Sequence, residues 1–225
     1  MRSFYLAGFS AILLATSALA QNAPAGGGRG AGGGTNIVGT IVSFDGTTVT
    51  IKADADGAVT TAPLAPNAAI TTSQKVKLAD IKTGEFVATG GTLGADGKIH
   101  SNEIRIFPEA NRGRGEGQFP MAQQGQVMTN ATIKQVVSVS GGGTMKMSFK
   151  GSTVGADGKC TGRAPTDGSA GCTGETEIDV APDIAVVRQA IADKSALKAG
   201  AKATINVANG ADGAPSVARV TLTLN

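Results

Sequence analysis

The sequence predicts an all-β protein with two tandem copies of a small β-barrel, each with one short helical crossover, after a cleaved signal peptide. Three observations support this prediction. A segment of the first half recurs in the second half at a fixed spacing, apolar and polar residues alternate over many short runs, and 33 glycines provide frequent turns. Many short strands joined by glycine turns are typical of closed sheets.

The repeat is carried by three pairs of blocks: 65–70 with 181–186, 81–84 with 197–200, and 94–97 with 210–213. Each pair is offset by 116 residues, as from 65 to 181, and no gap interrupts the match from Ala65 through Ile106. A constant offset over a long segment is the mark of a duplicated domain. We therefore expect the two halves to share one fold.

The first twenty residues (1–20) have the pattern of an export signal. A positive N-terminus precedes the apolar stretch Phe4–Leu14, which is too short to span a bilayer, and Ala18–Ala20 places small residues before a cut at Gln21. Residues 21–35 form a Gly-rich flexible leader. Because no later segment is apolar enough to be transmembrane, we predict a periplasmic or secreted protein.

The first barrel domain is expected over residues 36–107. Alternation of β-formers with polar residues predicts strands at 37–44, 48–52, 58–64, 68–72, 85–93 and 98–107. Asp45-Gly46 and Asp96-Gly97 fit hairpin turns. Residues 73–82 lack the alternation, so they are predicted to form a short helical or turn-like crossover.

The second barrel domain is expected over residues 128–225 in the same order. Its strands are predicted at 131–139, 145–149, 175–180, 201–207 and 217–224. Its crossover, 184–194, is the better helix candidate because Ala, Val, Arg and Gln follow one another there. Aligning Ile51 with Phe149 gives an offset of 98, so the second copy carries 18 extra residues (116 − 98) in an insertion at 151–175.

Both cysteines of the chain, Cys160 and Cys172, lie in this insertion. Exported proteins meet an oxidising environment, and the insertion has no apolar run that could fold it by burial. A disulfide between the two cysteines is therefore predicted. Two cysteines and a single histidine, His100, are too few for a structural zinc site of four such ligands.

Small domains of five or six strands with one crossover are typical of the oligonucleotide/oligosaccharide-binding (OB) barrel, so we expect OB-like barrels. An outer-membrane barrel is excluded because it needs aromatic girdles. After the signal, the aromatic side chains that remain are Phe44, Phe86, Phe107, Phe119 and Phe149.

The sequence contains no recognisable catalytic motif. His100 stands alone in a predicted strand near Asp96 and is interpreted as a solvated side chain. The Asp-Gly pairs are interpreted as turns, because the carboxylates that would complete a calcium loop after Gly57 are missing. Nucleic-acid binding is disfavoured by a net charge of only +3 and by the lack of Trp and Tyr after the signal. We expect no enzyme activity, no cofactor, no metal site and no nucleic-acid partner.

Residues 108–127 are predicted to link the two barrels. Four charges in this stretch form the candidate ligand site at the domain junction: Glu109, Arg112, Arg114 and Glu116. The alternative, which we favour, is that these charges pair with one another and fix the angle between the domains.

Four blocks resemble a known family: 107–109, 112–117, 128–132 and 193–202. They are similar to blocks of small exported proteobacterial proteins that carry tandem small β-barrel domains of unknown function, sometimes labelled metal-transporter permeases. The resemblance implies an exported tandem barrel and no established activity. The Gly-rich leader and the cysteine-containing insertion depart from the family pattern.

The leading hypothesis is a non-catalytic exported envelope protein that acts as an interaction or scaffold module. The alternative is a periplasmic binding protein for a small anion or metal ion at the domain junction. The sequence does not identify the partner, which is an envelope protein or a small ligand.

Overall fold

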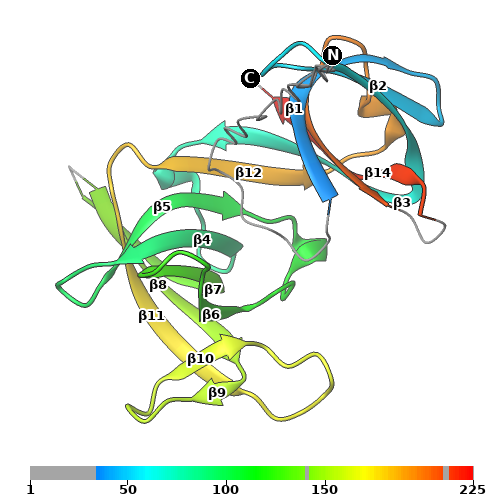
Figure 1. Cartoon of the computed structure of the whole chain (residues 1–225). Coiled ribbons are helices and arrows are strands. Elements are labelled where there is room, and N and C mark those ends of the chain that lie inside the picture. Colours follow the sequence, from blue (N-terminus) through cyan, green and yellow to red (C-terminus); the bar gives the residue numbers. More distant parts are fainter. Residues whose placement is uncertain (1–33, 140–141, 210–212, 225) are drawn as a thin grey trace, which may run out of the picture. The chain divides into compact units, whose positions relative to one another are not determined.

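The computed structural model describes residues 34–139, 142–209 and 213–224 (Figure 1). The predicted signal peptide 1–20 and most of the leader 21–35 lie outside these residues. The elements are the strands β1 (Gly34–Phe44), β2 (Thr48–Ala53), β3 (Val59–Val76), β4 (Phe86–Leu93), β5 (Ile99–Ile106), β6 (Gly117–Pro120), β7 (Gln126–Val139), β8 (Gly142–Gly151), β9 (Thr153–Val154), β10 (Cys160–Arg163), β11 (Cys172–Val180), β12 (Ala185–Ile191), β13 (Lys202–Asn209) and β14 (Pro215–Leu224), with 3-10 helices η1 (Leu78–Asp80), η2 (Glu109–Asn111) and η3 (Lys194–Ala196). None of the helices in this part of the chain is long and apolar enough to cross a membrane.

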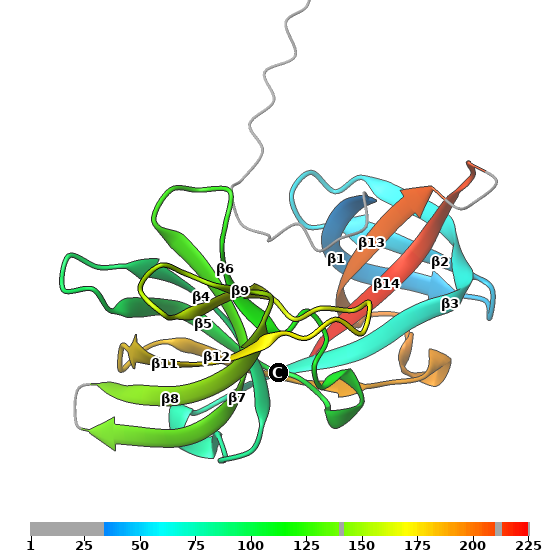
Figure 2. The same cartoon turned by 90° about the horizontal axis from the view of Figure 1, so that it is seen from below.

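Five strands close into a barrel, here named ring A: β1, β2, β3, β14 and β13 (Figure 2). Neighbouring strands are antiparallel except β14, which runs parallel to β3. Alternate side chains of each strand point inward, which is the physical reason for the period of two in the sequence. They fill the ring, together with Leu197 from the turn after η3; the strand residues are Ile41, Val49, Ile51, Ala62, Leu64, Ile70, Ala203, Ile205, Val217, Val220 and Leu222.

A second circuit of pairings, named ring B, joins β4, β5, β11, β8 and β7. Here β11 runs parallel to β5, and the other pairs are antiparallel. The β5–β11 ladder spans only two residue pairs, Ile99 with Ile178 and His100 with Asp179. The ring surrounds a second core: Ile81, Val87, Ile99, Ile104, Ile106, Ala131, Ile133, Met145, Met147, Phe149, Cys160, Ile178, Val180 and Val186.

Each ring takes strands from both halves of the chain. Ring A joins β1, β2 and β3 of the predicted domain 36–107 to β13 and β14 of the predicted domain 128–225. Ring B joins β7, β8 and β11 of the second segment to β4 and β5 of the first. Among the described residues, neither segment forms a ring by itself, so the two halves are interlocked by an exchange of two strands each.

The two rings have the same register, pair by pair. In ring A, Ile51 pairs with Thr60, and in ring B, Met147 pairs with Thr176. Equivalent residues of ring A and ring B are separated in the chain by a constant number for each strand. The separation is 92 residues between β1 and β7 (41 and 133) and 96 residues between β2 and β8 (51 and 147). It is 116 residues for the remaining strands (60 and 176). Even the bulge in β1 between residues 41 and 43 recurs in β7 between residues 133 and 135.

This register corrects the alignment made from the sequence. The match of Ile51 with Phe149 is two residues out of step, because Ile51 corresponds to Met147. The second half therefore carries 20 extra residues (116 − 96) between its second and third ring strands. A side-chain period of two hides such an error, since a slip by two residues leaves every side chain on the same face.

The helical crossover predicted at 184–194 is wrong, and the helical or turn-like crossover predicted at 73–82 is limited to its last part, around η1. Residues 184–194, expected to be the better helix, contain β12 and only a short turn of 3-10 helix, η3. In the first half, 73–82 continues β3 to Val76 before η1. These stretches are extended because β12 pairs with β3 on one side and with β5 on the other, and tertiary pairing outweighs a weak local helix propensity.

The β3–β12 ladder joins the two halves around a local centre of symmetry. Ser73 pairs with Gln189, and these two residues are themselves related by the shift of 116. On either side, Thr71 pairs with Ile191, and Lys75 pairs with Val187. Each segment thus presents its equivalent residues to the other in reverse order.

The strands predicted at 58–64 and 68–72 merge into the single long strand β3. Its register against β14 shifts between Leu64, paired with Val217, and Ala69, paired with Arg219. Residues 65–68 bulge out at this shift, and Pro66 lies among them. Proline lacks a backbone N–H, so a bulge is one of the few sites where a strand accepts it.

The predicted disulfide between Cys160 and Cys172 is confirmed, with the two Cα atoms 5.7 Å apart. The insertion 151–175 lies largely outside ring B, where β10 pairs with β6 of the predicted linker. Cys160 itself is buried and packs against the core of ring B. The disulfide thus fastens the insertion to the ring as well as closing its own loop.

Candidate functional site

The four charged residues proposed from the sequence do not form one cluster. Arg112 donates to both carboxylate oxygens of Glu109, to the carbonyl of Gly84 at 2.7 Å and to the hydroxyl of Thr132 at 3.2 Å. These contacts hold the linker against Gly84, just before β4, and against Thr132 on β7. The same ion pair lowers the pKa of Glu109 and raises the pKa of Arg112, chiefly through its hydrogen bond.

Glu116 and Arg114 lie apart from this pair. One carboxylate oxygen of Glu116 accepts a hydrogen bond from the backbone N–H of Lys150 at 3.0 Å, which ties the linker to β8. Within the described residues, the Arg114 guanidinium makes no hydrogen bond or ion pair. Further along, the Arg163 guanidinium of the insertion stacks over the Phe119 ring, with Cζ 3.7 Å from its centroid. The linker charges thus serve mainly to position the linker.

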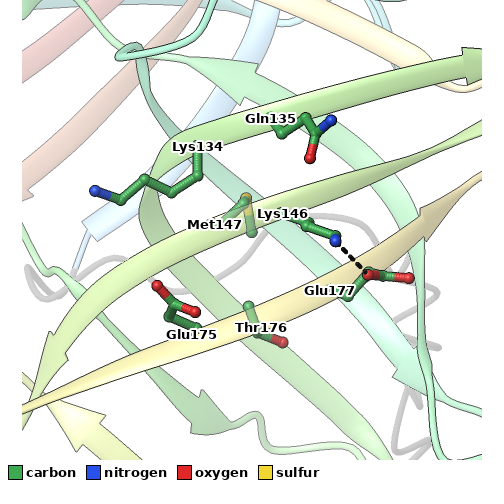
Figure 3. A pocket seen from close by; sticks show the side chains of 7 residues that line it. All are labelled: Lys134, Gln135, Lys146, Met147, Glu175, Thr176 and Glu177. Carbon is green, nitrogen blue, oxygen red and sulfur yellow. Dashed lines mark ion pairs between the residues drawn. The ribbon is translucent and has the colours of Figure 1, made fainter.

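An open depression lies over the outer surface of β7, β8 and β11 (Figure 3). It is lined by Lys134, Gln135, Lys146, Met147, Glu175, Thr176 and Glu177. The Lys146 ammonium lies 3.9 Å from a Glu177 carboxylate oxygen, and Figure 3 shows this pair bridging two neighbouring strands. The lining balances two lysines against two glutamates and contains no aromatic side chain, so it lacks the stacking platforms and positive charge of a single-strand nucleic-acid site.

A second group of polar side chains gathers where the β4–β5 hairpin meets β11. Asp96 lies in the hairpin turn, His100 lies on β5, and Asp179 is its parallel partner on β11. One ligating atom from each of the three lies within 4.8 Å of the other two. The imidazole Nε2 is 3.2 Å from both carboxylate oxygens of Asp96, and Lys98 Nζ is 3.4 Å from Asp179.

Local backbone geometry places the first of these groups. The backbone N–H of Lys98 donates to Asp96 at 3.0 Å, which closes the Asp-Gly turn expected from the sequence. This hydrogen bond is the main cause that lowers the pKa of Asp96, followed by the bond to His100. Asp96 is therefore an ionised carboxylate that faces the imidazole.

The sequence-based interpretation of His100 was incomplete. The side chain is half exposed, as expected for a solvated strand residue, and Asp96 is its neighbour. Asp179 was missed because it comes from the other half of the chain and reaches His100 only through strand exchange. Periodicity within one half carries no signal for that contact.

Comparison with known protein families, with curated proteins and with solved structures finds no match.

Proposed function

We propose that this protein is a non-catalytic exported envelope protein, periplasmic or secreted, that acts as an interaction or scaffold module. Its two rings represent OB-like barrels that arose by internal duplication and exchange strands. The strand order of each ring, 1-2-3-5-4 with the fifth strand parallel to the third, supports this interpretation. So does the shared register, which extends to the bulges in the first strands.

One observation carries the proposal: the two rings present different surfaces at equivalent positions. The charged pair Lys146–Glu177 of ring B corresponds to Thr50 and Thr61 of ring A, whose hydroxyls lie 3.1 Å apart. Glu175 corresponds to Val59, which is 62% exposed. A charged face and a threonine- and valine-rich face on one interlocked body suit a module that contacts two partners, or two parts of one partner.

The alternative, a binding protein for a small anion or metal ion at the linker, has less support. An anion would need free donors there, and the Arg112 guanidinium is already engaged by Glu109, Gly84 and Thr132. Arg114 alone offers a single exposed cation. Isolated surface charges bind weakly in water and salt.

The proposal is tested by site-specific photocrosslinking in the source cells. A photoreactive amino acid is placed at Gln135, beside Lys146 on the charged face, and separately at Ser43, the equivalent position of ring A. We expect at least one of the two positions to yield a discrete covalent adduct with another protein. An adduct from Gln135 should weaken when Lys146→Glu is added, whereas an adduct from Ser43 should not. Adducts from neither face would overturn the proposal.

A further inference from the structure

A group of three side chains, Asp96, His100 and Asp179, comes from two elements, the β4–β5 hairpin and β11. The strand exchange places these two elements side by side. Asp96 and His100 belong to the hairpin of the first half, and Asp179 belongs to β11 of the second. All three side chains are partly exposed, at 49%, 51% and 26%, so they can turn toward a common centre without repacking the core.

The donor set is one nitrogen and two carboxylates. Zn²⁺ accepts these ligands at about 2.0–2.2 Å, and three protein ligands plus water complete its tetrahedron. Ligand atoms of such a tetrahedron lie about 3.4 Å apart. The contact between His100 and Asp96 already has nearly this length, at 3.2 Å. The distances among the three ligand atoms do not exceed 4.8 Å, and small rotations of exposed side chains can shorten them to this length. Imidazole favours zinc and similar transition metals over Ca²⁺ and Mg²⁺, which prefer more oxygen ligands.

Gly94 leaves the space that the Asp96 and His100 side chains occupy. A Cβ atom at this position would lie 2.5 Å from Asp96 Oδ1 and 2.7 Å from His100 Nε2, so any other residue would push these atoms apart. A lysine ammonium, Lys98 Nζ, lies against the third ligand, Asp179. The Asp179 carboxylate is therefore already paired with one positive charge, at the place where a metal ion would bind it.

Two internal comparisons show that the fold alone does not require this cluster. In ring A, the positions equivalent to Asp179 and His100 are Pro63 and Ser216, which cannot supply the same ligands. The turn at Gly155–Lys159 repeats the geometry around Asp96, since Asp157 accepts the backbone N–H of Lys159 at 3.1 Å. Thr161 stands there in place of the histidine.

We propose that Asp96, His100 and Asp179 form a binding site for a divalent transition-metal ion of the zinc type. The ion displaces Lys98 from Asp179 and replaces the hydrogen bond between His100 and Asp96 with two metal bonds. The three ligands lie on both sides of the β5–β11 ladder, which is only two residue pairs long and is the shortest ladder of ring B. A bound metal ion would therefore link the two strands where they share the fewest backbone hydrogen bonds. This site is independent of the partner surfaces proposed above.

The proposal is tested by titrating Zn²⁺ into the disulfide-intact protein without a histidine tag. His100 is the only histidine of the chain, so its ring signals in NMR spectra are unambiguous. We expect one Zn²⁺ per chain by calorimetry, with shifted imidazole signals and a raised melting temperature. His100→Gln and Asp179→Asn should each weaken binding at least tenfold, and Asp157→Asn, in the matched turn, should leave it unchanged.

Lys98→Ala separates a metal site from a merely structural cluster. Removing the competing ammonium should tighten Zn²⁺ binding severalfold, whereas a cluster that serves only as an ion-pair network gains no affinity from the loss of a member. Circular dichroism of each variant confirms folding before titration. Unshifted imidazole signals at millimolar Zn²⁺, or equal affinity in the wild type and His100→Gln, would overturn the proposal.

Discussion

Cutting the chain between β6 and β7 tests the strand exchange directly. A protease site inserted between Gln123 and Gln124 lies in an exposed loop, so cleavage leaves the strands intact. The two fragments correspond to the two predicted domains. If each domain formed its own barrel, the fragments would separate after cleavage. Because each ring contains strands from both fragments, we expect them to remain together in native buffer.

The strength of this association follows from the cores. The second fragment contributes Leu197, Ile205, Val217, Val220 and Leu222 to ring A, and the first contributes Ile81, Val87, Ile99, Ile104 and Ile106 to ring B. Burial of such a side chain contributes about 1.5–3 kcal/mol, so these ten contribute roughly 15–30 kcal/mol, an upper estimate. Association costs about 4–15 kcal/mol. The midpoints of the two ranges differ by about 13 kcal/mol, and even a balance of only about 8 kcal/mol would give a dissociation constant of about 1 μM.

Size-exclusion chromatography of the cleaved protein at about 10 μM provides the assay. We expect one peak at the elution volume of the uncut protein, and two peaks only after denaturation. Two native peaks, each with a β-type circular dichroism spectrum and a cooperative melt, would refute strand exchange, because they would show that each segment folds alone.

Three other predictions follow from single features. Replacing Cys160 and Cys172 by Ser should lower the free energy of unfolding by about 3 kcal/mol, because the bridge closes a short loop of 12 residues' separation; non-reducing mass spectrometry of the wild type should detect no free thiol. The pKa of Asp45 lies below its ordinary 3.8, chiefly because the backbone N–H groups of Thr47 and Thr48 donate to its carboxylate. The ionised carboxylate therefore stabilises the folded state at pH values above 3.8. This stabilisation is lost as the pH falls through the lowered pKa. Melting curves between pH 2 and 6 should therefore show a shallower acid decline for Asp45→Asn than for the wild type, and identical declines would contradict this. Ile104→Ala, at a fully buried position, should cost about 2–5 kcal/mol in urea unfolding, whereas Val59→Ala, at an exposed one, should cost less than about 0.5 kcal/mol.

The sequence predicts the strands well because burial alternates along them. The runs around Ile51 and Ile205 place buried side chains at every second residue, and this local signal does not depend on which strand lies alongside. Turns such as Asp96-Gly97 are equally local. The confirmed disulfide depends on nothing more than two cysteines close in the chain.

The pairing of the strands is not local, so periodicity cannot supply it. Because the halves share one register, β3 can pair with the fifth strand of either half, and the sequence does not distinguish β5 from β14. For the same reason, the sequence does not predict the contact between His100 and Asp179. The stretch 184–194 was misjudged because its extended form depends on two neighbours, β3 and β5, that the segment itself does not reveal.

Strand exchange also determines when the protein can fold. Ring B cannot close before Val180 has been synthesised, and ring A cannot close before β14, which ends at Leu224. Until then β1, β2 and β3 have emerged without their closing partners, and their apolar faces have no core to enter. Folding is therefore a late event with many contacts between distant residues, which makes it slow. A chain of this design remains open for most of its synthesis, a state that a transport channel for unfolded polypeptides can accept.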